Sequence, residues 1–539
     1  MRTKTWKLLS KVSNKKEKDW LTKLLAKNRG ITSPQELDEF LNPSFEQITG
    51  QSIGNTKKAI DRIEKAIKNK EKVIIYSDYD ADGICATAIM WEALYDLGIK
   101  VMPYVPHRIK EGYGLANPAI SDLAKQGVKL IITVDHGVTA IDQVEHAKKL
   151  GIDVIITDHH VLPKKLPDSY ALTHTTSLCG AGVSWRLAWD IVAKLNRSYQ
   201  EKLKSKLELA SIATIADLVP LIGANRAIVK IGLEKLASTK RFGINALIKA
   251  TGITPPIGTY EIGHIIAPRI NAMGRIEHGL DALRLICAKN RNQAEELASL
   301  LTKTNSKRQD LTSKAIESAF TLVKEEQSVG VITHPTWHEG IIGLVASRLV
   351  ETYHRPFIVI AKGEVYSKGS ARSVPGFNIV EAIRASGTFL NAGGHPMAAG
   401  FTIETKQIEI FSAQINKYAQ TNLTDDMLEP VVNIESELET KDISTQTLSQ
   451  IKRFEPFGMG NPEPVFLTRH MEVEDVRGVG PTSAHLKLQL SSHSAIGFNM
   501  GEFRARIRPG YKIDAVYTLN DDKYNGGFQL KLKDLEITN

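Results

Sequence analysis

Cysteine is scarce in this chain of 539 residues, which contains only Cys85, Cys179 and Cys287 and no Cys-x-x-Cys pair. So few thiols exclude a disulfide framework and a zinc–thiolate site, and they fit a reducing compartment. Long apolar runs are also missing, because no stretch approaches the roughly 18 uninterrupted apolar residues of a membrane span. The N-terminus carries no apolar run of signal-peptide length. We therefore expect a cytoplasmic protein that has no membrane partner.

The composition is otherwise that of a globular protein, with 42% hydrophobic and 24% charged residues. This balance excludes a mainly disordered or fibrous chain, and the length suits about three or four domains. The formal net charge is +9. A basic surplus of this size permits an acidic partner such as nucleic acid but does not require one.

Short apolar runs rich in β-branched residues alternate with helical patterns in the first part of the chain. These runs are residues 73–77, 101–105, 130–134 and 153–157. Continuous apolar runs of this length are typical of strands buried on both faces of a sheet. Strands that alternate with helices indicate βαβ units, so we predict a mainly parallel sheet.

The later sequence predicts the remaining architecture. Residues 290–328 lack glycine and proline and have helical periodicity, which predicts one long helix between two lobes. Beyond about residue 425, alternating apolar and polar segments separated by turn residues are typical of a small antiparallel barrel such as an OB-fold. We therefore predict an α/β fold with a parallel-sheet catalytic lobe, a long linking helix, a second smaller α/β lobe and a C-terminal OB-like β-barrel. The predicted boundaries are 1–50 for an N-terminal extension that packs on the adjoining domain, 51–289, 290–328, 329–425 and 426–539.

Acidic residues follow three of the predicted strands. They stand in the segments Asp78-Tyr79-Asp80-Ala81-Asp82, Asp135-His136 and Asp158-His159-His160. The carboxyl ends of parallel strands open onto one crevice, so these side chains should meet there. Carboxylates a few ångströms apart repel one another, and divalent cations are the usual compensation. Oxygen and imidazole ligands without thiolate favour Mn²⁺ or Mg²⁺, and this many acids can hold two ions.

A simpler interpretation competes with the metal site. A single aspartate at the end of a strand most often caps the next helix. Three successive strands that end in this way, two of them with adjacent histidines, favour the metal site instead. Asp217, in the apolar segment ELASIATIADLVPL, needs a partner for its carboxylate. For this residue a metal ligand and a helix-end cap both remain open.

The motifs DYDADG (78–83), VDHG (134–137), TDHH (157–160) and ATIADLVPL (213–221) occur in this order. In these motifs the chain resembles the DHH phosphoesterases. Among them it is most similar to the single-stranded-DNA-specific exonucleases. Further segments carry the resemblance: VPHRIKEGYGL (105–115), APRINAMGRI (267–276), WHEGIIGLVASRL (337–349), GSARS (369–373), GGHPMAAGF (393–401) and PFGMGNPEPVF (456–466). It implies a DHH catalytic domain, a DHH-associated substrate-binding domain and an OB-fold that binds nucleic acid. It also implies a 5′→3′ exonuclease that uses two Mn²⁺ or Mg²⁺ ions and releases 5′-mononucleotides from single-stranded DNA.

The resemblance assigns roles residue by residue. The implied metal ligands are Asp78, Asp80, Asp82, Asp135, His159 and Asp217. The implied catalytic residues are Asp80, Asp82, Asp135, His159, His160 and His395. The implied substrate-binding residues are Arg108, Arg269, Asn271, Arg275, Ser370, Arg372, Gly393, Gly394 and His395. Asp135 should bridge both ions, while Ser370, Arg372 and Arg108 should bind the 5′-phosphate of the DNA. The family further implies repair and recombination, with a single-strand-binding protein and a helicase as partners.

Other functions remain to be weighed. A DHH phosphodiesterase for short oligonucleotides or dinucleotides shares the metal motifs but usually lacks the barrel and the long linker. A soluble pyrophosphatase has no use for this length. A DNA-binding scaffold related to the nuclease should have lost ligands, whereas every candidate acid and histidine is present here. For the aromatic residues of the predicted barrel, two roles remain open: stacking on DNA and packing in the core. These residues are Phe498, Phe503, Tyr511, Tyr517, Tyr524 and Phe528.

Overall fold

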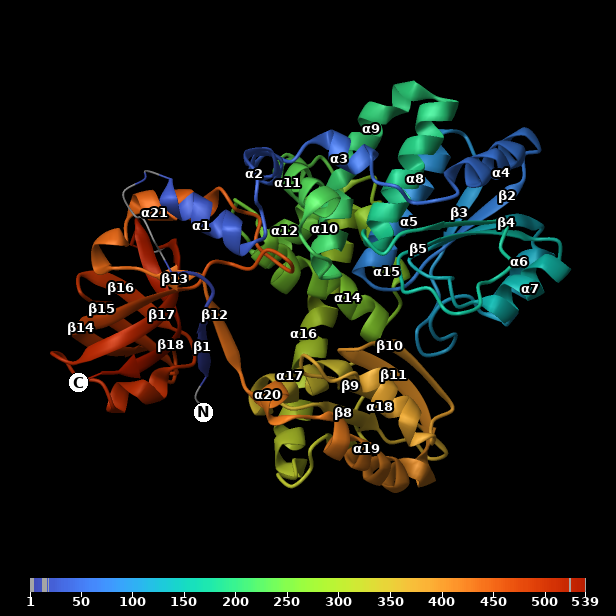
Figure 1. Ribbon diagram of the computed structural model, residues 1–539. Coiled ribbons are helices and arrows are strands. Elements are labelled where there is room, and N and C mark those ends of the chain that lie inside the picture. The colour runs from blue at the N-terminus through green and yellow to red at the C-terminus, as the bar shows by residue number, and fades with distance from the viewer. Residues whose placement is uncertain (1–3, 12–16, 18, 523–524, 539) are drawn as a thin grey trace.

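The computed structural model describes residues 4–11, 17, 19–522 and 525–538. Figure 1 shows a large lobe whose sheet lies at the right, a smaller lobe below it, and a C-terminal β domain at the left. The helix α16 (Arg291–Leu322) runs from the large lobe down to the smaller one. The predicted linking helix therefore ends earlier than expected, because the chain becomes extended at Val323.

The sheet of the large lobe is parallel throughout, as predicted. Its strands are β2 (Lys72–Tyr76), β3 (Val101–Tyr104), β4 (Val128–Val134), β5 (Asp153–Asp158) and β6 (Ala171–His174), in the spatial order β3-β2-β4-β5-β6. Successive strand residues alternate between two apolar cores, so Ile75 and Ile132 face one side and Ile74 and Ile131 the other. The strand order reverses between β2 and β4. In open α/β sheets such a reversal opens a crevice at the carboxyl ends of the strands.

Helices cover both faces of this sheet. The face with the larger core carries α4 (Thr56–Lys68), α5 (Ala81–Asp96), α8 (Gly180–Leu195) and α10 (Leu207–Ala216). The other face carries α6 (Asn117–Lys125) and α7 (Ile141–Lys149). Two further helices, α11 (Gly223–Ala237) and α14 (Ala267–Ile276), pack beside α10 and α16. The apolar strands are therefore enclosed, and only the loops at their ends are free to build a site.

The smaller lobe has a mixed sheet. Its elements are β7 (Gly330–His334), α17 (Ile342–Tyr353), β8 (Phe357–Ala361), β9 (Tyr366–Arg372), α18 (Ile379–Ser386), β10 (Asn391–His395), β11 (Ala398–Glu404) and α19 (Ile408–Asn422). The strand order is β10-β11-β9-β8-β7. Gly393, Gly394 and His395 form the end of the edge strand β10. Gly394 has φ +140° and faces Ala399 so closely that a Cβ would lie 2.3 Å from the Ala398 carbonyl oxygen.

The C-terminal domain is OB-like. Its strands are β14 (Phe466–Val479), β15 (His485–Leu490), β16 (His493–Gly497), β17 (Lys512–Asp521) and β18 (Phe528–Ile537). The long strand β14 pairs with both β15 and β17 and shifts register on the way, as strands of small curved sheets do. Tyr517 is fully buried in the core of this domain.

The first part of the N-terminal segment lies elsewhere than expected. We predicted that it packs on the domain that adjoins it in the chain. Instead β1 (Thr5–Leu8) pairs in parallel with β12 (Val431–Ile434), and α1 (Trp20–Asn28) contributes Leu21 and Leu25 to the core of the C-terminal domain. The later helix α3 (Phe45–Thr49) does pack on the large lobe, where Ile48 lies in the core and the Phe45 ring contacts Trp185 and Trp189. The first part of the chain therefore packs against the C-terminal domain.

Among the described residues, no helix combines the length and the apolar character needed to cross a membrane.

Candidate metal centre

The loop after β2 holds three of the predicted ligands. Asp80 is the N-cap of α5, and its Oδ1 accepts hydrogen bonds from the backbone N–H groups of Asp82 and Gly83, both at 3.0 Å. Asp80 therefore caps the next helix, as the simpler interpretation predicts, but it uses only one of its two carboxylate oxygens to do so. Asp78 lies deeper, and Gly83 approaches it so closely that a Cβ would lie 2.7 Å from the Asp78 Cβ. The glycine of DYDADG is thus required for the loop to close around Asp78.

Asp82 is held by the start of another helix. Its two oxygens accept hydrogen bonds from the N–H groups of Gly180 and Ala181 at the N-terminus of α8, at 2.6 and 2.7 Å. A helix N-terminus stabilises negative charge, so α8 anchors this carboxylate. A Cβ on Gly180 would lie 2.5 Å from the Asp135 Cβ. Sequence reasoning gave the segment around Cys179 no role, although it shapes the floor of the cleft.

Asp135 follows β4 with a left-handed backbone, at φ +66°. Such a conformation costs a non-glycine residue roughly 1–2 kcal/mol and is typical of functional sites. Two hydrogen bonds hold it there: Asp135 donates from its N–H to the Thr157 carbonyl at 3.0 Å, and the Tyr113 hydroxyl donates to the Asp135 carbonyl at 3.2 Å. The strained backbone directs the carboxylate into the cleft.

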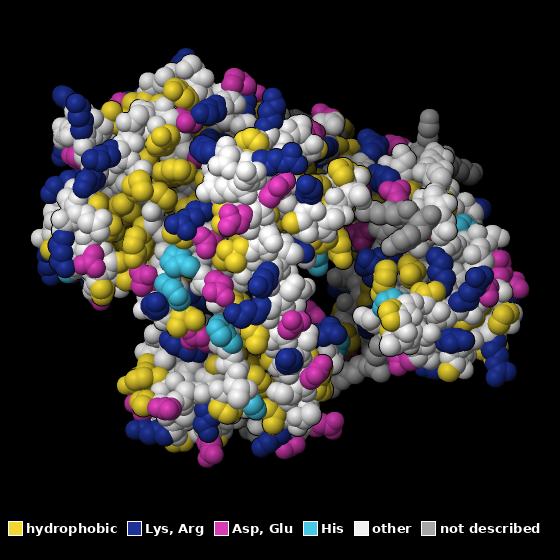
Figure 2. Space-filling model, turned by 180° about the vertical axis from the view of Figure 1, so that it is seen from behind, with side chains coloured by type: hydrophobic (Ala, Val, Ile, Leu, Met, Phe, Trp, Pro, Cys, Tyr) yellow, Lys and Arg dark blue, Asp and Glu magenta, His cyan; other side chains and the backbone are white. Residues whose placement is uncertain are grey.

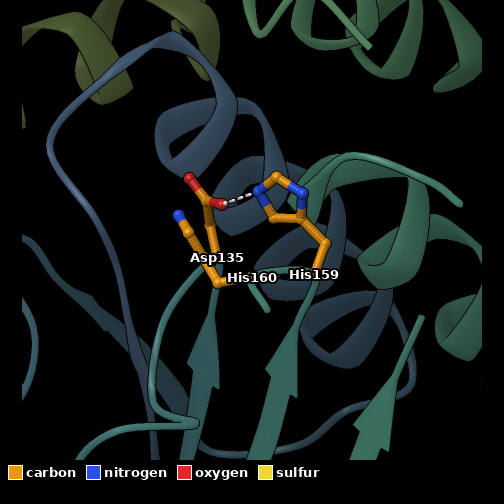
Figure 3. A group of neighbouring side chains, drawn as sticks. All are labelled: Asp135, His159 and His160. Atoms are coloured by element: carbon orange, nitrogen blue, oxygen red, sulfur yellow. Dashed lines mark ion pairs between the residues drawn. The ribbon is translucent and has the colours of Figure 1, made fainter. Parts of the chain in front are cut away.

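His159 faces Asp135 from the end of the neighbouring strand. Figure 3 shows the carboxylate and the ring pointing toward one another, with His159 Nε2 3.0 Å from Asp135 Oδ1. Burial and the neighbouring His160 lower the pKa of His159 to about 4, so the ring is neutral at physiological pH. The Asp135 oxygen is buried and accepts no hydrogen bond from the described residues. Two basic atoms that face each other in this way are typical of two ligands to one cation.

His160 is oriented from behind. Its Nδ1 lies 2.7 Å from Asp158 Oδ1, and its carbonyl accepts a hydrogen bond from His174 Nε2 at 2.7 Å. Although burial lowers the pKa of His160, the bond to Asp158 outweighs it and raises this pKa above its usual value. The ring of His395, from the smaller lobe, stacks on His160 with centroids 5.9 Å apart. The edge strand β10 therefore reaches the metal centre across the gap between the lobes.

The carboxylates repel one another strongly. Burial and the charge of Asp80 raise the pKa of Asp78 well above its usual value, and burial and Asp82 do the same for the pKa of Asp135. Burial and Asp80 raise the pKa of Asp82 to about 6. Burial and Asp82 raise the pKa of Asp217 to about 9. The cleft thus concentrates more negative charge than it can hold without cations.

The donor atoms suit two such cations. Three groups have ligand atoms within 4.8 Å of one another: Asp78, Asp80 and Asp135; Asp82, His159 and Asp217; and Asp135, His159 and His160. Asp217, whose role the sequence left open, belongs to the second group, with its Oδ2 3.7 Å from His159 Nε2. Asp135 and His159 each belong to two of these groups. Oxygen and imidazole donors without thiolate fit Mn²⁺ or Mg²⁺.

A group of arginines lies opposite the acids. Arg372 donates from Nη1 to Ser370 Oγ at 3.3 Å, and both side chains crowd Gly343 at the start of α17. Burial and the charges of Arg108 and Arg372 lower the pKa of Arg275 to about 10. Among the described residues these guanidinium groups have no carboxylate partner, although Arg275 donates to the Gly340 carbonyl at 3.1 Å and Arg372 to the Ala371 carbonyl at 2.8 Å. Such groups beside a helix N-terminus are suited to binding an anion. Sequence reasoning missed the contribution of α17, although its motif WHEGIIG was visible.

The remaining predicted contacts have other neighbours. Asn271 accepts a hydrogen bond from the Ala81 N–H at 2.7 Å and so braces the loop after β2. Arg269 donates from Nη1 to the Ile265 carbonyl at 2.7 Å, and its Nε is buried without a partner among the described residues. Seen from behind, histidines gather along the boundary between the large and the smaller lobe, while lysine and arginine side chains are spread over the surface (Figure 2).

Comparison with known proteins places the fold and the site in one class. Family models match the chain over residues 72–219 (DHH family, N-terminal domain), 314–421 (DHHA1 domain) and 434–534 (RecJ OB domain). The protein is therefore built as a DHH-family phosphoesterase with an OB domain.

Relatives narrow the assignment. The chain is 31% identical to the single-stranded-DNA-specific exonuclease RecJ of Haemophilus influenzae, covering 94% of each chain. It is 38% identical to the protein of that name in Bacillus subtilis, covering 89% of this chain and 63% of that longer protein. The crystal structure of Thermus thermophilus RecJ with Mn²⁺ matches with a TM-score of 0.86 at 28% identity, over 100% of this chain and 80% of that one. A second structure of that protein contains Mg²⁺. The chain belongs to the RecJ family, which confirms the resemblance that its motifs indicated.

Proposed function

We propose that this chain is a metal-dependent exonuclease that degrades single-stranded DNA from the 5′ end to 5′-mononucleotides. The observation that carries the proposal is the presence of two facing sites, one of clustered carboxylates and one of arginines that have no carboxylate partner among the described residues, on lobes that meet at His160 and His395. Relatives that carry the name single-stranded-DNA-specific exonuclease support it.

The chemistry is divided between the ions and the side chains. Mn²⁺ or Mg²⁺ bound there would supply an activated water and would stabilise charge on the attacking and leaving oxygens. The residues of the three ligand groups would hold the ions, and Asp135 and His159 each belong to two of these groups. Asp158 keeps the His160 ring in place, and His160 in turn supports His395. His395 is thereby positioned to contact the scissile phosphate from the opposite lobe.

The arginine group gives the reaction its direction. Arg372, Ser370 and the N-terminus of α17 can hold a terminal phosphate, with Arg108 and Arg275 adding charge from the other lobe. A guanidinium binds two phosphate oxygens at once, which suits an end group. A 5′-phosphate held there sets which phosphodiester reaches the metals.

Replacing Arg372 with alanine should remove the preference for 5′-phosphorylated ends. A hydrogen bond to a charged group contributes about 1.5–3 kcal/mol, so the preference should fall by roughly 10- to 150-fold. The measurement is the ratio of kcat/KM for 5′-phosphate and 5′-hydroxyl oligonucleotides. Arg348→Ala, an exposed arginine paired with Glu351 in the same lobe, is the control. An unchanged ratio would remove Arg372 from the pocket.

The C-terminal domain presents one exposed aromatic among those named from the sequence. Tyr517 is buried, Phe503, Tyr511 and Phe528 pack against the core, and Tyr524 lies outside the described residues. Phe498 is 49% exposed, with Lys531 Nζ 5.5 Å from its ring centroid. An aromatic face beside a lysine is suited to stacking on a base of single-stranded DNA.

We expect Phe498→Ala to weaken the binding of single-stranded DNA by about 1–3 kcal/mol, the usual contribution of one stacked base. Fluorescence anisotropy with a labelled oligonucleotide in chelator measures binding without hydrolysis. Phe242→Ala, another exposed aromatic but in the large lobe, serves as the control. Equal affinities of the two variants would assign DNA binding to another surface.

The decisive experiment uses end-labelled single-stranded DNA, duplex DNA and dinucleotides, each with Mn²⁺, Mg²⁺ or chelator. The proposal expects mononucleotides from the 5′ end of single strands only, and no products in chelator. Faster cleavage of dinucleotides than of long strands would favour the alternative, a phosphodiesterase of short oligonucleotides. DNA binding without cleavage under any metal would favour the scaffold. Action in repair and recombination in the cytoplasm, with a single-strand-binding protein and a helicase, completes the proposal.

A further inference from the structure

The motif PFGMGNPEPVF has no part in the chemistry above. It lies between α21 (Thr445–Lys452) and β14 and forms a tight turn, in which Gly458 and Asn461 exchange backbone hydrogen bonds of 2.9 and 3.2 Å. The turn belongs in sequence to the C-terminal domain. In space it contacts the large lobe, because the Leu221 N–H donates to the Met459 carbonyl at 2.7 Å.

Glycines allow this approach. Gly460 has φ +73°, and a Cβ there would lie 2.8 Å from the Pro220 Cβ. A Cβ on Gly458 would lie 2.8 Å from Cδ1 of Leu221, which is the far end of a flexible side chain. Any larger residue at 460 must therefore push the 217–222 loop, whereas at 458 a side chain can give way.

The loop in question begins with the metal ligand Asp217. Asp217 ends α10, and the next residue, Leu218, has φ +57° and is 65% exposed. No hydrogen bond to the Asp217 carboxylate is found among the described residues, where its ion-pair contact is His159 Nε2 at 3.7 Å. The position of this carboxylate therefore depends on the path of its own backbone, which the turn restrains at Leu221.

The turn is itself firmly held. Arg226, on α11, donates to the carbonyls of Phe454, Glu455 and Pro456, and lies 3.9 Å from the ring centroid of Phe40. The fully buried Asn461 donates to two of the same carbonyls and accepts from Arg29 Nε at 2.7 Å. The described residues offer Arg226 no carboxylate partner, so its buried charge is balanced by carbonyl dipoles, three from residues 454–456 and one from Phe40.

We propose that residues 456–461 are a positioning device for Asp217, through which docking of the C-terminal domain sets the geometry of the metal site. The use of the metal in catalysis rests on the function proposed above, whereas the binding of the metal does not. In this proposal the motif acts on a loop of the large lobe. The C-terminal domain then contributes to metal affinity in addition to DNA binding.

The test is Gly460→Ala, with Gly510→Ala as the matched control. Gly510 also has a positive φ, of +88°, and lies in the same domain, but a Cβ there would meet nothing within 4 Å. Isothermal titration of the metal-free proteins with Mn²⁺ measures affinity without DNA. Groups that orient metal ligands usually contribute 10- to 100-fold, so we expect at least about a tenfold loss for Gly460→Ala and no loss for Gly510→Ala. Excess Mn²⁺ should restore cleavage, while DNA binding in chelator stays unchanged.

Equal Mn²⁺ affinities of the two variants would overturn the proposal. If Gly460→Ala does not fold, Asn461→Ala decides, because it removes the two hydrogen bonds from Asn461 Nδ2 that hold the turn and adds no atom. This variant should bind Mn²⁺ more weakly than Gly510→Ala. Equal Mn²⁺ affinities would again overturn the proposal. A wild-type protein that binds Mn²⁺ but cuts no DNA would contradict the proposed function alone, since the comparison of affinities stands without cleavage.

Discussion

Replacing Asp135 with asparagine should reduce DNA hydrolysis by at least about a thousand-fold. Asp135 belongs to two of the three ligand groups, so one substitution weakens both ion sites. Ions at a phosphoryl centre contribute several kcal/mol to the stabilisation of the transition state, and each 1.36 kcal/mol is a factor of ten in rate. The measurement is kcat on a 5′-phosphorylated oligonucleotide at saturating Mn²⁺.

Folding must be separated from chemistry in this variant. Asparagine tolerates the left-handed backbone at this position, and it removes a charge that the metal-free cleft accommodates poorly. We therefore expect the metal-free variant to melt no lower than the wild type, but to lose the rise in Tm that Mn²⁺ produces. Asp122→Asn, an exposed aspartate paired with Lys125, should change neither quantity. Near-normal turnover in a folded Asp135→Asn protein would refute the bridging role.

Gly180→Ala should also reduce activity strongly, although glycine offers no ligand. Its Cβ would lie 2.6 Å from Asp135 Oδ1 and would displace the carboxylate or the start of α8, which also holds Asp82. Disturbing two ligands should cost at least the 10- to 100-fold of a group that orients one, in both metal affinity and rate. Titration with Mn²⁺ and measurement of kcat on the same preparation test the expectation.

The control for this variant is Gly263→Ala. Gly263 is also helical, but a Cβ there would have its nearest neighbour at 3.7 Å, an ordinary contact. Both variants add one methyl group to a glycine of a helical segment, so a loss confined to Gly180→Ala reports the contact with Asp135. If Gly180→Ala binds Mn²⁺ as tightly as Gly263→Ala does, the N-terminus of α8 has no part in shaping the site.

Much of the fold and of the site could be predicted from local patterns. Continuous apolar runs predict buried parallel strands, and the carboxyl ends of neighbouring parallel strands lie at the same edge of the sheet. Asp78, Asp135 and His159 could therefore be brought together without coordinates. Residues that act through the backbone are harder to find, because a strained Asp135 or an anchoring Gly180 has no signature in the periodicity. Asp217 stayed ambiguous for the same reason, since its segment is also a plausible helix end.

Local patterns along the chain were enough to establish the order of the lobes, the oxygen and imidazole chemistry of the cleft and the family, because strand ends and motifs are short-range features. Three contacts became known only from the folded protein: His395 stacks on His160, β1 pairs with β12, and the turn at Gly460 meets the loop after Asp217. Each of them joins residues that are far apart in the chain. Such pairings depend on how whole domains pack, and packing distributes its energy over many side chains that show no pattern in the sequence.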